Sequence, residues 1–299
     1  MTKLLLLLAS LPCVYLAQGP ESRATLAAAG IKQICAATEA DLASRERLPV
    51  PGTTARAGLA SPTRSPWIVA SGWRFMRNPA AKYAYTLPAG KAALAAAEAF
   101  AYGADAVLKI DPADLKAAGE MLAFLEGLPA VDLPAVADFA VVDDGSAVTG
   151  EVMNLLVRRN LLFEVVKAPS PRFRLTIAMG SREYPAADAA DPSAFALKIR
   201  RQLTDEQRTV RLYGSEVVIC RLTGDAGRIR LHLINYGGRD IEGLRIRLRG
   251  AYREGDAFVA GTGRLALTDF AVAGGATEFS LPRMAAYAVI DLMAARSAF

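Results

Sequence analysis

The chain has 299 residues, of which 53% are hydrophobic and 22% are charged. This length corresponds to about two domains with sizeable cores, and the composition excludes general disorder. The formal net charge is +5, but the arginines are spread along the chain and are not gathered in one patch. We therefore expect no nucleic-acid partner.

The first residues are typical of an export signal. Lys3 supplies a positive charge, and an apolar run begins at Leu4 and reaches Ala17. This run is shorter than the roughly 20 apolar residues of a transmembrane helix, and it fits a signal peptide. We predict a signal peptide over residues 1–19, export to the periplasm or out of the cell, and no membrane contact after cleavage.

The three cysteines allow two interpretations. Cys13 would leave with the predicted signal peptide, so Cys35 and Cys220 would remain. Pairing between them is open, because disulfides form in oxidising compartments. Two buried free thiols are the favoured interpretation, because these residues are far apart in sequence and each lies in an apolar stretch.

Residues 20–88 form an N-terminal segment in which few elements are predicted. A short helix followed by a strand is expected over 26–37, and a further strand over 67–70. The stretch 41–65 combines charge, Pro, Gly and Thr without a clear period, which is typical of a loop, with room for one short strand.

Residues 89–205 are predicted to form an α/β domain. Asp111 and Asp191 each precede a proline, which favours helix N-caps at both positions, and Thr149 is the expected cap of a third helix. The expected helices cover 90–102, the stretch after Asp111-Pro112, 149–159 and 193–202; the expected strands cover 105–110, 139–142, 161–166 and 173–178. This alternation predicts a flavodoxin-like or amidotransferase-like, mostly parallel sheet with helices on both faces.

Residues 206–299 are predicted to form an antiparallel β-sandwich, because the hydrophobic period changes to two from Leu212 onward. Apolar residues alternate there with arginines, at 228–230 and again at 245–249. Like charges on one face repel, so we predict that solvent or acidic side chains cover these arginines. His232 shares the first arginine face and is expected to be exposed.

The histidine count restricts the possible chemistry, because His232 is the single histidine of the sequence. A Ser-His-Asp or Cys-His site would have to use it, and zinc sites commonly need three or four Cys, His or carboxylate ligands. The sequence also lacks a phosphate-binding glycine motif of the P-loop or dinucleotide type. We expect no metal and no cofactor.

Acidic residues at predicted strand ends are weak catalytic candidates. Asp143 and Asp144 follow one strand, Asp111 follows another, and Glu151 lies in the next helix. Ligands of open α/β sheets bind at this edge, and a carboxylate pair could act as general acid and base, as in glycosidases. The alternative is structural, because Asp-Asp-Gly is ordinary turn chemistry and Asp111 and Glu151 suit helix starts.

Aromatic and basic side chains are concentrated before the α/β domain, and they include both tryptophans of the sequence. Sugar rings stack on flat aromatic faces, while Arg or Asn donates hydrogen bonds to hydroxyls, so a glycan is the expected ligand. The alternative is that the tryptophans are core anchors. The candidate ligand-binding residues are Arg64, Trp67, Trp73, Arg74, Arg77, Tyr83 and Tyr85, together with Asn78.

The segment Gly72-Trp-Arg-Phe and the stretches 96–107 and 231–236 resemble the latter part of secreted glycoside-hydrolase-like proteins, over about residues 65–293. In such proteins a (β/α) barrel precedes an amidotransferase-like α/β domain, similar to the trimerisation domain of certain β-galactosidases, and a β-sandwich follows. A complete barrel takes about 250 residues. The resemblance therefore implies that residues 20–88 are a barrel remnant. It transfers no catalytic residue, since the strand end that would bear the amidotransferase cysteine has Asp143-Asp144.

Three hypotheses follow for the function. The first is an exported, non-catalytic or degenerate glycoside-hydrolase-like protein that binds carbohydrate through the aromatic and basic segment. The second is an active glycoside hydrolase that uses Asp111, Asp143 or Glu151. The third is a structural protein whose α/β domain makes a homo-oligomer without a small ligand.

Overall fold

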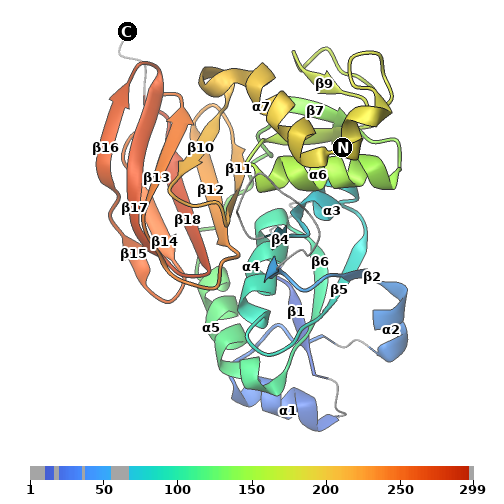
Figure 1. Ribbon diagram of the computed structural model, residues 1–299. Helices are drawn as coiled ribbons and strands as arrows, with labels where there is room; N and C mark the ends of the chain where they lie inside the picture. Colours follow the sequence, from blue (N-terminus) through green and yellow to red (C-terminus); the bar gives the residue numbers. More distant parts are fainter. Residues whose placement is uncertain (1–10, 17–19, 36–37, 55–66, 296–299) are drawn as a thin grey trace, which may run out of the picture.

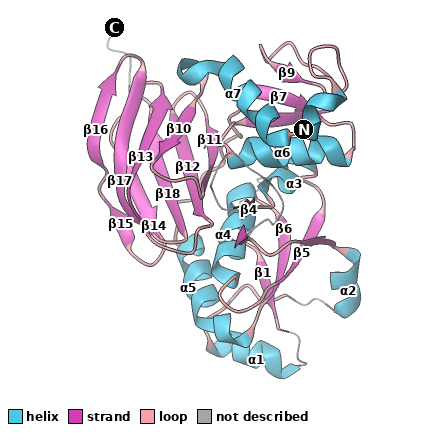
Figure 2. Ribbon diagram, in the orientation of Figure 1, coloured by secondary structure: helices cyan, strands magenta, loops and turns pink. Residues whose placement is uncertain are grey.

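The computed structural model describes residues 11–16, 20–35, 38–54 and 67–295. Figure 1 shows two α/β units, one below the other, with a β-sandwich beside them. Figure 2 shows that the helices cover the α/β units, while the sandwich is built from strands. The predicted combination of an α/β part and a C-terminal β-sandwich is confirmed.

The first unit is built on a four-stranded parallel sheet. Its strand order is β1 (Cys13–Tyr15), β6 (Asp105–Lys109), β5 (Lys82–Thr86) and β2 (Glu46–Leu48). Beyond β1, Val14 also makes a parallel bridge to Ile34. The strands β1 and β5 were not predicted from the sequence, because they are short, whereas β2 lies in the stretch 41–65, for which one short strand was allowed.

The two faces of this sheet are covered differently. The helices α1 (Pro20–Ala28), α4 (Ala92–Tyr102) and α5 (Leu115–Glu126) contribute to the main core on one face. Alanines fill much of α4, which allows close approach to its neighbours. On the other face Leu42, from the short helix α2 (Glu39–Ser44), packs with Ala84 and Val107.

Predicted helix signals in this unit are confirmed. Asp111 caps the 3₁₀ turn Pro112–Asp114, with its carboxylate accepting from the Ala113 N–H at 2.9 Å. Gly103 ends α4 at φ 64, in the left-handed region that favours glycine. The helix α3 (Gly72–Arg77), however, was not predicted.

The second unit has a three-stranded parallel sheet in the order β8 (Phe163–Val166), β7 (Phe139–Val142), β9 (Thr176–Ile177). Helices α6 (Ala147–Arg158) and α7 (Pro192–Gln207) accompany it. Asp191 caps α7 as predicted, but the cap of α6 is Ser146, whose hydroxyl accepts from the Thr149 N–H. The prediction that Thr149 caps this helix was wrong by one turn.

The strands expected in one sheet over 89–205 thus divide between two sheets. The connection between them explains the division: the Val136 N–H donates to the Leu222 carbonyl, and the Gly224 N–H donates to the Pro134 carbonyl. The linker pairs with the sandwich before the chain starts β7. Backbone hydrogen bonds to the sandwich therefore draw the chain away from the first sheet.

The sandwich has one sheet in the order β10 (Val210–Tyr213), β13 (Ile241–Arg249), β17 (Ala276–Met284), β16 (Thr268–Ala273). The other sheet has the order β11 (Val218–Gly224), β12 (Arg228–Asn235), β18 (Tyr287–Met293), β14 (Asp256–Val259), β15 (Gly263–Leu265). The pairs within both sheets are antiparallel. Ile229, Leu231 and Leu233 point into the core between the sheets, which confirms the predicted period of two.

Acidic side chains cover the arginine faces, as predicted. Asp291 accepts from Arg228 at 3.0 Å and from Arg230 at 2.6 and 2.7 Å. Glu278 pairs with Arg245 and Arg247 on the other sheet. The carboxylates remove the repulsion that neighbouring arginines would otherwise cause.

The prediction that His232 is exposed was wrong. Its ring is 6% exposed, lies 6.2 Å from the Phe100 ring of α4, and places Nδ1 2.6 Å from the Tyr287 hydroxyl. The strand pattern was right, but the α/β unit covers this part of the sheet. A period of two identifies which residues share a face and does not tell whether another unit covers that face.

The cysteines pair in a way that was not predicted. Cys13 and Cys35 form a disulfide, while Cys220 is a buried free thiol, as expected for that residue. The prediction that Cys35 is a free thiol was wrong, because β1 brings Cys13 next to the strand segment at Ile34. Within the described residues no helix is long and apolar enough to cross a membrane.

Candidate functional site

The candidate ligand-binding residues come together around α3, at the contact between the two α/β units. Trp73 lies on α3 with the Arg74 guanidinium stacked 4.4 Å from its ring centroid. Arg74 Nη1 also lies 3.4 Å from Glu46 Oε1 of β2. The side chains of Arg74 and Glu46 are 34% and 42% exposed, whereas Trp73 is partly buried and packs against the main core. We call Trp73, Arg74 and Glu46 the α3 surface group.

Trp67 occupies a more enclosed position. It lies in β4 (Trp67–Val69), which pairs with β3 (Gly52–Thr54), and the Arg158 guanidinium of α6 stacks 3.8 Å from its ring centroid. The tryptophan is half-buried and packs against the main core. Trp67 therefore joins β4 to α6, which corresponds to the core-anchor alternative for this residue.

Arg77 is used in an ion pair across the two units. Its Nε and Nη2 donate to Asp143 Oδ1 at 3.0 and 2.8 Å, and Nη2 also donates to the Ser146 carbonyl at 2.9 Å. Desolvation acts to raise the pKa of Asp143, but the hydrogen bonds and charge of Arg77, with help from Lys167, hold that pKa below its usual value. The pair fastens α3 to the end of β7.

Tyr83 and Tyr85 lie in the core of the first unit, each 1% exposed. The Tyr83 hydroxyl donates to the carbonyls of Arg74 and Asn78, and the Tyr85 hydroxyl donates to Glu98 Oε2 at 2.5 Å. Neither ring can stack on a ligand in this arrangement. Arg64 lies outside the described residues.

The candidate catalytic carboxylates are engaged in local structure. Asp111 is a cap, as described above, and Asp143 holds Arg77. Asp144 accepts from the Ser146 N–H at 2.9 Å, and this bond helps to hold its pKa below the usual value against desolvation. Glu151 Oε2 accepts from the Asn154 amide at 3.2 Å. The structure does not bring these four residues together as an open pair of carboxylates.

A buried carboxylate that the sequence analysis missed lies where three parts of the chain meet. Glu98 of α4 is 0% exposed, and it accepts from the Ser71 N–H at 2.5 Å, from Tyr85, and from the Tyr236 hydroxyl at 2.6 Å. Burial raises the pKa of Glu98, while these hydrogen bonds act to lower it. Its contacts connect α4, the start of α3 and the end of β12, which makes it a fastening point of the fold.

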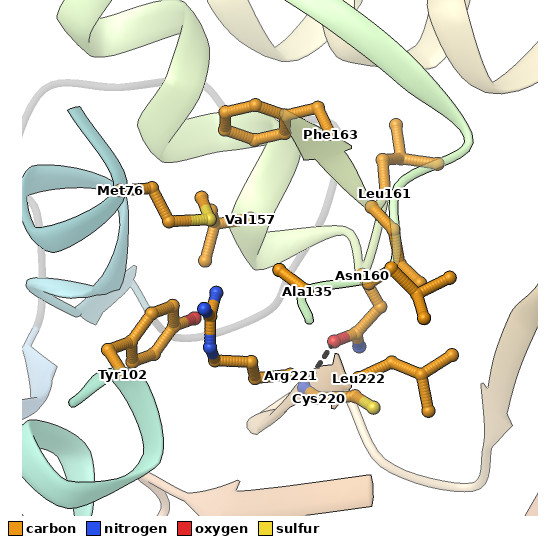
Figure 3. A pocket seen from close by; sticks show the side chains of 12 residues that line it. Met76, Tyr102, Ala135, Val157, Asn160, Leu161, Phe163, Cys220, Arg221 and Leu222 are labelled. Atoms are coloured by element: carbon orange, nitrogen blue, oxygen red, sulfur yellow. Dashed lines mark hydrogen bonds between the residues drawn. The ribbon is translucent and has the colours of Figure 1, made fainter. Parts of the chain in front are cut away.

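A cavity of about 30 Å³ lies nearby, between α3, α4, α6 and β11. Figure 3 shows the Arg221 guanidinium pointing into it beside the Tyr102 ring, with Met76, Val157 and Phe163 among its apolar walls. A cavity of this size holds a few water molecules at most, whereas small-molecule sites measure about 300–1,000 Å³. It is too small for a sugar ring. No cluster of three or more potential metal ligands was found among the described residues.

Comparison with solved structures shows a glycoside-hydrolase-like fold. An α-L-fucosidase (isoenzyme 2) from Paenibacillus thiaminolyticus aligns over 85% of this chain and 65% of its own, with a TM-score of 0.56 and 11% identity. A catalytic mutant of a GH42 β-galactosidase from G. stearothermophilus covers 77% of this chain and 52% of its own, at a TM-score of 0.40 and 9% identity. A β-galactosidase from Rahnella sp. R3 aligns over 83% of this chain and 54% of its own, at a TM-score of 0.37 and 11% identity.

At these identities the likeness concerns the fold alone. The sequence matches no family model, and no curated protein is significantly similar to it. The chain also spans less than two thirds of the fucosidase chain and about half of each galactosidase chain. Substrate and activity therefore have to be argued from the residues of this chain.

Sequence reasoning missed Glu46, Glu98, Tyr102 and Arg221 as site residues. Glu98 and Tyr102 lie on the same helix, Glu46 and Arg221 lie in other stretches of the chain, and none belongs to a recognisable motif. A signal was present for Glu98 alone, since a single glutamate in the alanine-rich stretch 92–101 is unusual on a helix that is otherwise apolar. Such a residue is expected to be paired when the helix is buried.

Proposed function

We propose that this protein is a carbohydrate-associated protein of glycoside-hydrolase-like fold that binds a glycan without cleaving it. The observation that carries the proposal is the α3 surface group. A partly buried indole, with a partly exposed guanidinium and carboxylate beside it, offers stacking, hydrogen-bond donors and acceptors in one place. These are the groups that a ring with several hydroxyls requires, and they lie on a scaffold whose fold resembles that of a fucosidase.

The neighbour order of the first sheet supports a barrel origin. In a (β/α) barrel each strand pairs with the next, and the first also pairs with the last. The neighbours across this sheet are, in order, the segment at Ile34, β1, β6, β5 and β2. This is the order of the strands along the chain when that order is closed into a circle, with an opening between Ile34 and β2. In a doubly wound sheet of the flavodoxin type the first strand would instead pair with the second and third strands. We infer that the segment at Ile34 and the strands β1, β2, β5 and β6 belong to an opened barrel.

We propose that the protein does not cleave glycans because its candidate catalytic carboxylates are already engaged in other interactions. A glycosidase needs two carboxyl groups that face one substrate, about 5–10 Å apart. Asp143 and Asp144 are instead held by Arg77 and by turn N–H groups. Asp111 caps a turn, and Glu151 is hydrogen-bonded within its own helix.

Glycan-array screening followed by calorimetric titration with the best ligand tests the proposal. We expect Trp73→Ala and Arg74→Ala to weaken binding at least about tenfold, since each removes a contact of about 1.4 kcal/mol or more. The matched control is Arg172→Ala, because Arg172 also stacks on an aromatic ring, that of Phe173 at 4.5 Å, in a different loop. Unchanged affinity in folded Trp73→Ala and Arg74→Ala proteins would refute the assignment of the site.

A panel of chromogenic glycosides addresses the hydrolase alternative. We expect no turnover above background in the full chain. Turnover that is lost in Asp111→Asn or Glu151→Gln would contradict the non-hydrolytic proposal and support an active hydrolase. Sedimentation of the same sample would show whether the homo-oligomer of the third hypothesis forms, and a monomer would count against that hypothesis.

We also propose that the protein is exported, and the Cys13–Cys35 disulfide provides a way to test where a signal peptide would be cleaved. A disulfide fits an oxidising compartment, but cleavage after Ala17 would remove Cys13 and leave Cys35 without its partner. Mass spectrometry of the N-terminus of the cell-derived protein distinguishes the possibilities. A mature chain that begins before Cys13 retains the disulfide, whereas one that begins near residue 19 has Cys35 as a free thiol.

A further inference from the structure

The strand β1 is short, and it depends on the segment of chain that follows it. It pairs in parallel with β6 through the residues Cys13 to Tyr15 and lies beside that strand in the first sheet (Figure 1). On its other side the Val14 N–H donates to the Gln33 carbonyl at 2.7 Å, and the Val14 carbonyl accepts from the Cys35 N–H at 2.9 Å. So short a paired stretch is a weak attachment, and such elements are the first to open in a folded protein.

The Cys13–Cys35 disulfide fastens β1 to this segment. It joins cysteines 22 positions apart and closes a loop that contains α1. A crosslink restricts the freedom of the open chain, and it does so more strongly for longer loops. With the disulfide intact, β1 cannot leave β6 unless the segment at Cys35 leaves with it. From Cys35 the chain leads to α2, whose Leu42 packs against Ala84 and Val107 of the sheet.

The release of β1 would have consequences for the first unit. Val14 and Leu16 are buried and belong to the main core, together with Leu26 of α1. The Tyr15 carbonyl also accepts from the Ile110 N–H at 3.1 Å, just after β6. Without β1, the edge of β6 would lose its hydrogen-bond partner and the core would open on that side.

The two cysteines of the disulfide are placed where a reductant can reach them. Both residues are only partly buried, whereas Cys220 is a buried thiol. Thiol–disulfide exchange requires a thiolate to reach one of the two sulfurs. A dithiol would supply two electrons and two protons: the S–S bond breaks, Cys13 and Cys35 become thiols, and the dithiol closes into its own disulfide.

We propose that the Cys13–Cys35 disulfide is a redox-sensitive latch on the first sheet: its reduction by a dithiol releases β1 from β6, while the rest of the molecule stays folded. The latch is independent of the glycan proposal. Glu46 of the α3 surface group lies on β2, and β6 and β5 separate this strand from β1.

Hydrogen exchange of the full chain, read by mass spectrometry of its peptides, tests the latch before and after treatment with dithiothreitol. Reduction should speed exchange at least about tenfold in peptides over 11–16 and 105–110 and leave β12 unchanged, because the opening is local. Alkylation of the denatured protein should find Cys220 alone reactive before reduction, and Cys13 and Cys35 as well afterwards. Unchanged exchange in β1 and β6, or equal acceleration in β12, would overturn the proposal.

Thermal unfolding gives an independent measurement of the same device. Reduction should lower the Tm by about 5–10 °C, because the loop between the two cysteines is no longer closed. The double variant Cys13→Ser/Cys35→Ser should show the lowered Tm without reductant and should not respond to it. If that variant does not fold, the reduced unchanged protein still provides the comparison.

The matched control is Cys220→Ala, which keeps the disulfide and removes the remaining thiol. It should show the full decrease in Tm on reduction. The same Tm in both redox states, or a response to dithiothreitol that persists in the double variant, would contradict the latch.

Discussion

Asp143 shows how one residue can resemble a catalytic acid in sequence and be a structural partner in the fold. It follows a buried parallel strand, where ligand-binding residues are common. Its side chain is 5% exposed and is fixed by Arg77 from α3, a residue 66 positions earlier. The sequence could not distinguish the two roles, because the partner comes from a distant helix that was not predicted.

Replacing Asp143 by asparagine tests this structural role. We expect Asp143→Asn to lower the free energy of unfolding at pH 7 by about 2–4 kcal/mol, because it leaves Arg77 without a charge partner in a mostly buried position. Urea denaturation measures the effect. The pKa of Asp143 is lowered, so its contribution is present above the ordinary carboxylate pKa and is lost as the pH falls through the lowered value. The difference between the two proteins should therefore shrink as the pH falls below the ordinary carboxylate range, and a difference that persists in acid would contradict the ion-pair explanation.

His232 should also make the protein less stable in acid, but here the cause is a buried base that the folded state keeps unprotonated. Burial first, and then the charges of Arg230 and Arg221, lower its pKa to about 3. The unfolded chain takes up a proton at this residue below about pH 6.5, whereas the folded chain does not. Stability should therefore fall as the pH decreases from about 6.5 to about 3, with a contribution of about 1.4 kcal/mol per pH unit.

The variant His232→Gln isolates this contribution. Urea denaturation between about pH 4 and 7 should show a shallower pH dependence for the variant than for the unchanged protein, by about one proton. Parallel curves would mean that His232 is not the residue responsible. The absolute stability of the variant is not the measured quantity, because the hydrogen bond to Tyr287 is also changed.

At the scale of elements, the close contact between α3 and α6 depends on a glycine. A Cβ at Gly150 would lie 2.8 Å from Arg77 Nη1 and 2.9 Å from Trp73 Cζ3. This glycine therefore allows the helix that carries the α3 surface group to pack directly on α6. A larger residue at position 150 would displace the Trp73 ring and the Arg77 ion pair together.

Gly150→Ala should consequently destabilise the protein by about 1–3 kcal/mol, despite the better helix propensity of alanine. It should also weaken glycan binding, because it shifts Trp73. Val148→Ala is the matched control, since Val148 lies on the same helix and is 47% exposed. Circular dichroism during thermal unfolding gives the stabilities, and a Gly150→Ala protein as stable as the control would show that α3 is not tightly seated on α6.

Other elements followed local chemistry and were predictable. The helices α4, α5 and α7, the caps Asp111 and Asp191, and the period of two in the sandwich were foreseen from hydrophobic period and capping residues. The strands β1 and β5 were not, since three to five residues of parallel strand give too short a pattern. They are strands because neighbouring strands supply their hydrogen bonds.

At the scale of the whole molecule, Glu98 links the first α/β unit to the sandwich, two regions that the sequence pattern assigns to separate domains. It accepts hydrogen bonds from Tyr85 in the first unit and from Tyr236 at the end of β12, a residue 138 positions away. The main core likewise runs from the first sheet into the sandwich, through Ile234 and Tyr287 among others. We therefore expect the units to unfold together.

Glu98→Ala tests this coupling. Loss of the carboxylate leaves two hydroxyls and a backbone N–H buried without their acceptor, each at a cost of about 1–3 kcal/mol, so a total loss of about 3 kcal/mol or more is expected. Differential scanning calorimetry should show one transition in the unchanged protein and a lowered or divided transition in the variant. Glu120→Ala, at an exposed position of α5, should stay within about 0.5 kcal/mol of the unchanged protein.

The sequence by itself determined the fold class, the sandwich with its faces of alternating residues, and the need for solvent or acidic side chains over the arginines. These follow from backbone periodicity and from charge repulsion, both of which act between near neighbours on an element. Only the tertiary structure decided that His232 is buried, that Cys13 pairs with Cys35, and that Arg221 lines a cavity. Burial and partner choice depend on which distant segments cover a residue, and a single sequence carries little information about those contacts.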